Sequence, residues 1–93
     1  MAQFRKKPVV IEAFTFDEFV EEGRKVAKSV VDGIPWAFDF RGHPITHGGE
    51  DLYIIPTLEG YMNFGPDAML IVGVKGELYP CRRDIFEQTY EAV

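Results

Sequence analysis

Turn residues divide the segment 57–93 into pieces of strand length, and this division constrains the fold more than any other feature of the sequence. Gly can adopt the positive φ that tight turns need, and Pro fixes φ near the value of the first turn position. Because short sequential strands joined by tight turns pair antiparallel, the segment predicts an antiparallel sheet. The expected turns are Glu59-Gly60, Gly65-Pro66-Asp67 and Lys75-Gly76, and the expected strands are 62–64, 68–74 and 77–81.

Extended runs elsewhere in the chain add strands to this sheet. Pro8 opens the run 9–14, which is largely apolar on both faces and therefore predicts a central strand, as does 68–74. Residues 42–51, which hold both histidines, are rich in turn residues and predict a loop. The other expected elements are strands at 36–41, 52–57 and 89–93 and one helical turn at 84–87, capped by Asp84.

A single amphipathic helix is predicted after the first strand. Thr15 and Glu18 match the capping box, in which each side chain accepts a backbone N–H of the other residue. An apolar stripe at helical spacing continues to about Asp32, and Gly33 is a natural helix stop. Gly23 lies near this stripe, so we expect a close approach of the helix to the sheet.

These elements predict an α+β fold in one domain, residues 1–93. One N-terminal amphipathic helix would pack on a curved, mainly antiparallel sheet of about six short strands. Cys81 is the only cysteine, which excludes an intramolecular disulfide and fits a reducing cytosolic compartment. The apolar run 9–11 is too short for a signal peptide or a membrane span, so no membrane association is expected. A net charge of −5 argues against general nucleic-acid binding.

Two groups of residues could carry chemistry. His43 and His47, close to Glu50 and Asp51, could bind zinc, although Pro and Gly in the segment argue against the helix that usually pairs such histidines, and a polar loop is the alternative. Cys81 could be a nucleophile, or simply a small buried apolar residue. Neither group matches a local catalytic signature, so we predict no catalytic residue, no metal and no cofactor.

Basic residues from both ends of the chain are the predicted ligand-binding site. If the first strand lies beside the last ones, they would form a positive rim for a nucleotide, another small anion or an acidic protein surface. The alternative is that they protect sheet edges from pairing. Glu12 is either a site carboxylate or half of an ion pair at the sheet margin. The predicted site comprises Arg5, Lys6, Lys7, Lys75, Arg82 and Arg83, with Glu12, Glu77 and Tyr79 nearby.

The closing segment resembles a family of small bacteriophage and prophage proteins, the PGDYG-type proteins. The opening 4–13 is similar too, and the family usually has Pro-Gly-Asp where this chain has Gly65-Pro66-Asp67. The resemblance covers about half of the chain and implies a phage origin and action in a bacterial cytoplasm, but no reaction. The matching segments are Thr-Leu-Glu-Gly at 57–60, Ile-Val-Gly-Val-Lys-Gly-Glu at 71–77, Tyr-Pro-Cys at 79–81, Asp-Ile-Phe at 84–86 and Thr-Tyr-Glu at 89–91.

We therefore expect a phage-derived, non-enzymatic binding protein that recognises a host protein or a small anionic ligand. One alternative is a small enzyme that depends on Cys81 or on His43 and His47. Another is an assembly accessory that forms a homo-oligomer through an exposed sheet edge.

Overall fold

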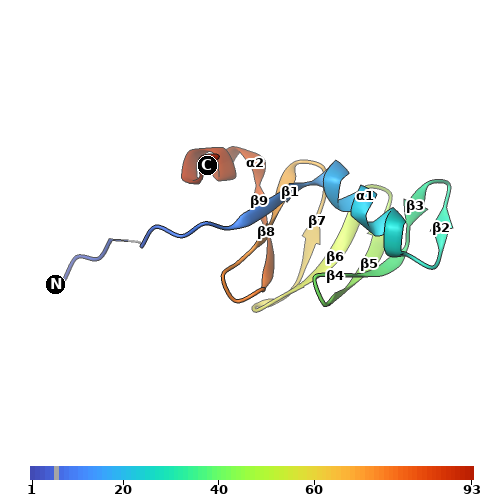
Figure 1. The fold of residues 1–93 in the computed structure, drawn as a ribbon, viewed down its shortest axis with the longest axis horizontal. Helices are drawn as coiled ribbons and strands as arrows, with labels where there is room; N and C mark the ends of the chain where they lie inside the picture. Colours follow the sequence, from blue (N-terminus) through green and yellow to red (C-terminus); the bar gives the residue numbers. More distant parts are fainter. Residues whose placement is uncertain (6) are drawn as a thin grey trace.

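The computed structural model describes residues 1–5 and 7–93 as an α+β fold whose strands pair antiparallel (Figure 1). The described residues form three sheets rather than one sheet of about six strands. The sheet order is β1-β8-β9 in the first, β2-β3 in the second and β4-β5-β6-β7 in the third. The strands are β1 (Glu12–Thr15), β2 (Val30–Val31), β3 (Ile34–Pro35), β4 (Ala37–Phe40), β5 (His43–Gly49), β6 (Leu52–Thr57), β7 (Gly60–Phe64), β8 (Ala68–Val72) and β9 (Leu78–Arg82); the helices are α1 (Phe16–Val26) and α2 (Arg83–Thr89).

The start of α1 confirms the predicted capping box. The Glu18 N–H donates to Thr15 Oγ1 at 3.1 Å, and the Thr15 N–H donates to Glu18 Oε1 at 2.8 Å. Gly23 confirms the predicted close approach, because a Cβ built there would lie 2.6 Å from the Phe38 ring of β4. The absence of a side chain at Gly23 thus lets the helix pack against β4.

The predicted end of the helix at Asp32 is wrong, because α1 ends at Val26. Asp32 and Gly33 have φ values of 51° and 78° and join β2 to β3 as a two-residue hairpin turn. Asp-Gly favours such a turn because both central residues need positive φ. This local signal overrides the apolar periodicity, and Val30 and Val31 lie in a strand with exposed side chains instead of in the buried helical stripe.

Phe19 of α1 is the centre of an aromatic core. Its fully buried ring lies 5.0–5.4 Å from the rings of four residues on β4, β6 and β7. Such pairs contribute beyond the burial of apolar area. The contacting residues are Phe38, Phe40, Tyr53 and Phe64. α1 therefore holds the four-stranded sheet against the three-stranded one.

The three-stranded sheet buries apolar side chains on both faces. β8 is central, as predicted, but β1 is an edge strand and begins at Glu12 rather than at Val9. Leu70 belongs to the aromatic core, whereas Ile71 is equally buried yet lies on the opposite face, beneath α2. The apolar residues on both sides of 9–14 thus reflect a two-sided sheet and not a central position.

The segment 42–51 is not a loop. Arg41 and Gly42, with φ values of 52° and 83°, form a two-residue turn into β5, and His43 pairs with Phe40. β5 continues to Gly49 with a register shift after His47. The prediction missed this strand because its turn and bulge residues resemble those of an irregular loop.

The last part of the chain is helical where a closing strand was expected. α2 extends to Thr89, and the Tyr90 N–H donates to the Phe86 carbonyl at 2.9 Å, so residues 89–93 form no strand. Phe86 and Tyr90 stack with ring centroids 5.0 Å apart, which is the helical i, i+4 contact. The helical turn at 84–87 is confirmed, but the N-cap is Arg82 rather than Asp84.

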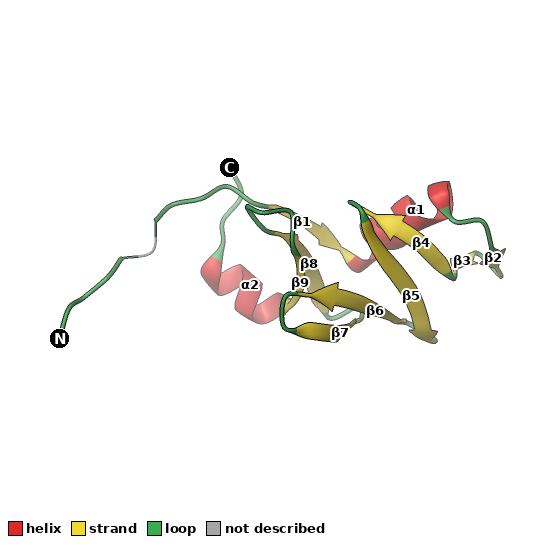
Figure 2. Ribbon diagram, turned by 90° about the horizontal axis from the view of Figure 1, so that it is seen from below, coloured by secondary structure: helices red, strands yellow, loops and turns green. Residues whose placement is uncertain are grey.

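Residues 1–5 and 7–11, hereafter the arm, leave β1 as an extended segment that projects from the body (Figures 1 and 2). The radius of gyration is 14.4 Å, whereas a compact chain of this length would have about 12 Å. In the described part of the chain, no helix is long and apolar enough to cross a membrane.

Candidate binding surface

The structure does not bring the predicted basic residues together. Arg5 and Lys7 lie on the projecting arm, and Lys6 lies outside the described residues. Lys75 is in the turn between β8 and β9, whereas Arg82 and Arg83 lie at the other end of β9. That strand is about 13 Å long, so the closing segment presents its basic residues at two separate places.

Acidic residues surround the arginine pair. Arg82 Nη2 donates to Asp84 Oδ2 at 2.8 Å, and both side chains are exposed. The hollow beside them contains three carboxylates and two guanidinium groups, so it has no excess of positive charge. Its lining residues are Pro66, Asp67, Arg82, Arg83, Asp84 and Glu87.

Glu12 forms an ion pair, which is one of the two roles that the sequence predicted for it. Its two carboxylate oxygens accept Arg41 Nη1 and Nη2 at 2.8 and 2.9 Å. These hydrogen bonds, and then the positive charge of Arg41, lower the pKa of Glu12. The Arg41 guanidinium also lies 5.3 Å from the centroid of the Phe14 ring. No sequence pattern pointed to Arg41 as the partner, because its position depends on the left-handed turn between β4 and β5.

Glu77 and Tyr79 have structural contacts. Glu77 Oε1 accepts the Lys75 N–H at 2.9 Å and so stabilises the β8–β9 turn. The Tyr79 hydroxyl lies 3.4 Å from the Tyr90 hydroxyl. Burial, followed by the hydrogen bond to Tyr90, raises the pKa of Tyr79 to about 12. Tyr79 is therefore neutral at physiological pH and connects β9 to the segment after α2.

The histidines and the cysteine occupy different places. Because a carbonyl oxygen only accepts, His43 Nε2 donates to the Gly76 carbonyl and His47 Nε2 to the Glu50 carbonyl, each at 2.8 Å. Gly76 and Cys81 lie at opposite ends of β9, which separates His43 from the thiol. Within residues 1–5 and 7–93, no three His, Cys, Asp or Glu side chains are grouped so that they could hold a metal ion.

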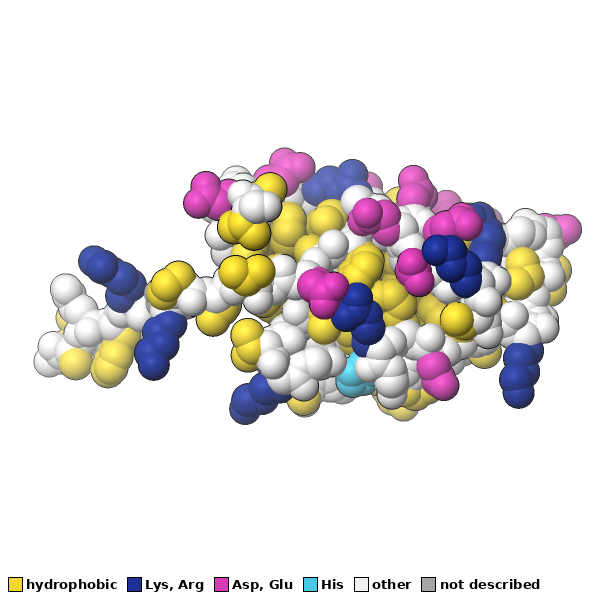
Figure 3. Space-filling model, in the orientation of Figure 1, with side chains coloured by type: hydrophobic (Ala, Val, Ile, Leu, Met, Phe, Trp, Pro, Cys, Tyr) yellow, Lys and Arg dark blue, Asp and Glu magenta, His cyan; other side chains and the backbone are white. Residues whose placement is uncertain are grey.

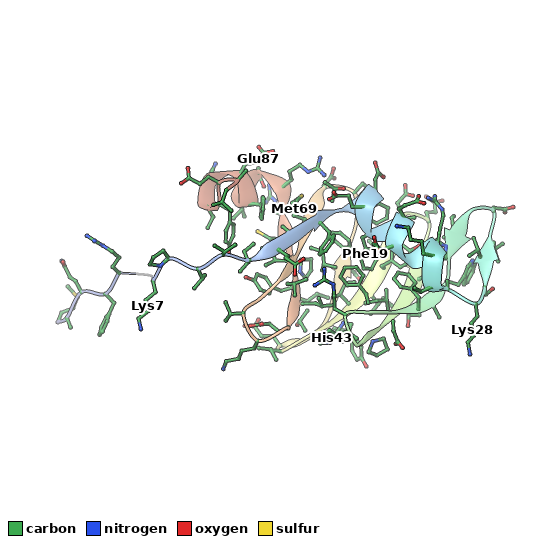
Figure 4. All side chains as sticks on the ribbon, viewed as in Figure 1. Lys7, Phe19, Lys28, His43, Met69 and Glu87 are labelled. Atoms are coloured by element: carbon green, nitrogen blue, oxygen red, sulfur yellow. The ribbon has the colours of Figure 1, made fainter. Side chains whose placement is uncertain are left out.

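An apolar groove lies between the arm, β1 and α2. It has a volume of about 310 Å³. In Figure 3, hydrophobic side chains gather on this side of the molecule, between the C-terminal segment and the arm, and Figure 4 shows Met69 between β1 and α2. Among the described residues that line the groove, Glu91 has the one ionised side chain. The lining residues are Val9, Val10, Ile11, Ala13, Met69, Phe86, Tyr90, Glu91, Ala92 and Val93.

Sequence reasoning missed this groove because three separate parts of the chain build it. Ala13 and Met69 belong to the outer face of the three-stranded sheet, and Phe86 belongs to α2. The apolar alternation on both faces of β1 was the available signal, but it was interpreted as a central strand.

Comparison with family models, curated proteins and solved structures found no match for this chain. The fold and the groove define a small α+β protein with an apolar surface beside an extended, basic arm.

Proposed function

We propose that this chain is a phage-derived, non-enzymatic binding module that takes a host protein segment in the groove between the arm, β1 and α2. The segment it recognises carries apolar side chains for the groove and acidic side chains for the arm. The resemblance of the closing segment to small phage proteins supports the phage origin. The observation that carries the proposal is the groove itself, because its lining is apolar and aromatic and faces solvent.

The chemistry of the groove favours a peptide over a small anion. A volume of about 310 Å³ is at the lower end of small-molecule sites and suits a few apolar side chains. Among the described lining residues the one ionised side chain is that of Glu91, which is acidic and would repel a phosphate. Val10, which lines the groove, is 76% exposed, and Phe4 on the arm is 94% exposed. Exposed apolar surface beside a groove is typical of protein interaction sites.

The basic residues of the arm favour an acidic partner. Arg5 and Lys7 lie within a few residues of Val9 and Val10 on the same extended segment. A partner with alternating acidic and apolar residues would satisfy both kinds of side chain at once. Charge complementarity of this type directs association and partner choice.

The test uses a short labelled peptide in which Glu alternates with Val, and fluorescence anisotropy as the measurement. Ala92→Glu places a bulky negative charge in the groove, and Val74→Glu adds the same charge to the exposed β8–β9 turn. We expect Ala92→Glu to weaken peptide binding by about tenfold or more, equivalent to about 1.4 kcal/mol, and Val74→Glu to leave it unchanged. Equal affinities of the two variants would overturn the proposal.

A nucleotide is the alternative ligand. A ligand that binds only the native state must stabilise it. If ATP raised the melting temperature of the wild type while the peptide did not, binding of a small anion would replace peptide binding in the groove as the proposed function.

A further inference from the structure

We propose that two copies of this chain pair antiparallel along the outer edge of β1 and the arm, which brings Lys7 of each copy to the groove of the other and Arg5 to the first turn of the other copy's α1. This inference rests on the proposed function for the role of the groove and names a second copy as the partner of the sheet edge.

The outer edge of β1 is open. In the described part of the chain, β1 is the last strand of its sheet and pairs only with β8. The Gly73 N–H donates to the Glu77 carbonyl and the Arg83 N–H to the Asp67 carbonyl. The backbone hydrogen bonds between β8 and β9 are therefore made by their odd-numbered residues. By the alternation of antiparallel ladders, even-numbered residues join β8 to β1. Ala13 therefore directs its N–H and carbonyl away from the sheet.

The same alternation extends this edge along the arm. Lys7, Val9 and Ile11 share the parity of Ala13, so they continue its row of backbone donors and acceptors. Pro8, which has no N–H, has the opposite parity, and the outer edge loses no donor there. Among the described residues, no backbone hydrogen bond joins 7–11 to another segment. An extended, apolar edge of this kind is a template for pairing with another chain.

The exposed area is large enough for a stable dimer. A compact protein of 10.6 kDa would expose about 5,500 Å², whereas this chain exposes 6910 Å². The excess is about 1,400 Å² per chain, and a standard protein interface buries about 1,600 Å² in total from both partners. Burial of part of each arm would therefore suffice.

Charge sets the register of the pair. If Val10 of both copies lies at the two-fold axis, Arg5 of one copy stands opposite Thr15 of the other. Asp17 and Glu18 follow directly in the first turn of α1, which is acidic. They belong to a hollow on α1 in which Glu18 accepts the Thr15 N–H, Glu21 pairs with Arg24 and Glu22 pairs with Lys25. Asp17 is therefore the carboxylate that would accept Arg5 of the second copy. The lining residues of the hollow are Phe14, Asp17, Glu18, Glu21 and Glu22.

The same register completes the groove. Residues directly opposite in an antiparallel pair point to the same face of the sheet. Lys7 of one copy then lies beside Ala13 of the other, and Ala13 lines the groove. In the dimer each groove gains the basic Lys7 side chain of the second copy, which an acidic and apolar segment requires. The isolated chain instead directs its arm away from its own body (Figure 1).

Sedimentation equilibrium over a range of concentrations tests the pairing. We expect the wild type to be a dimer and Arg5→Glu/Lys7→Glu to raise its dissociation constant by tenfold or more. Lys28→Glu/Lys75→Glu is the matched control, since it changes the net charge equally on exposed residues away from the arm. A wild type that is monomeric at every concentration, or an equal weakening of the dimer in both double variants, would overturn the inference.

Disulfide trapping tests the register in a Cys81→Ser background. In the Val10→Cys variant, the two cysteines would lie directly opposite each other at the two-fold axis. They would form a pair without backbone hydrogen bonds, and in such pairs the two Cα atoms lie closer together than in hydrogen-bonded pairs. We expect rapid cross-linking of Val10→Cys and none of Val74→Cys, an exposed valine in the β8–β9 turn. Equal cross-linking at both positions would contradict the register.

The peptide assay separates the two proposals. If the wild type is monomeric and still binds the Glu-Val peptide, and Ala92→Glu loses this binding, the pairing is refuted and the groove remains a binding site. A dimer that binds no peptide would support the pairing and refute the proposed function.

Discussion

Replacement of Gly23 by alanine tests the packing of α1 against the sheet. In an exposed helix interior, alanine is more favourable than glycine by about 1 kcal/mol. Here the added Cβ would lie 2.6 and 2.7 Å from two carbons of the Phe38 ring and 3.0 Å from Pro35 Cγ. Phe38 is buried, and its ring contacts Phe19, so it has little room to retreat.

Overpacking of a core costs about 1–3 kcal/mol, which exceeds the gain in helix propensity. We therefore expect Gly23→Ala to lower the free energy of unfolding by about 1 kcal/mol, and the melting temperature by about 4–8 °C. Urea unfolding followed by circular dichroism measures the change.

A double-mutant cycle with Phe38→Leu identifies the cause. The smaller side chain relieves the contact, so Gly23→Ala should be less harmful in the Phe38→Leu background than in the wild type. Stabilisation by Gly23→Ala in the wild type, or identical effects in both backgrounds, would refute the close approach.

Two further predictions concern titration. Arg41 lowers the pKa of Glu12 in the folded state, so the stability from this pair is present above the ordinary pKa of glutamate and is lost as pH falls through the lowered value. The urea midpoint of the wild type should therefore decline more steeply with acid than that of Glu12→Gln. Parallel declines of the two midpoints would contradict the ion pair. Because Tyr79 has a pKa of about 12, its neutral form stabilises the fold below the unfolded pKa of about 10, and this contribution is lost as pH rises towards 12. Absorbance titration should show a late tyrosine that disappears in Tyr79→Phe, and an unchanged late phase in that variant would show that another residue is responsible.

Local chemistry made the start of α1 predictable, since the capping box involves only Thr15 and Glu18. The end of the helix was not predictable from apolar periodicity, because Asp32-Gly33 specified a competing hairpin over the same valines. The turn at Arg41-Gly42 was missed for a related reason. Arginine is an uncommon residue at positive φ, and only the pairing of β4 with β5 holds it there.

The site depended on contacts that sequence spacing does not reveal. Glu12 and its partner Arg41 are 29 residues apart, so the ion pair was foreseen but its partner was not. The groove joins side chains as distant as Ala13 and Phe86. Arg5 lies close to Lys7 in the sequence and Arg82 is adjacent to Arg83, yet the direction of the arm and the length of β9 keep the arm, Lys75 and the arginine pair apart in a single chain.

Nuclear magnetic resonance mapping of the Glu-Val peptide on the ¹⁵N-labelled protein tests the binding surface most directly. A groove site predicts amide shift changes that concentrate at Ala13, Met69, Phe86 and Ala92 and are lost in Ala92→Glu. Changes confined to Arg82 and Arg83, or no changes at peptide concentrations that saturate the anisotropy signal, would contradict the groove as the binding site.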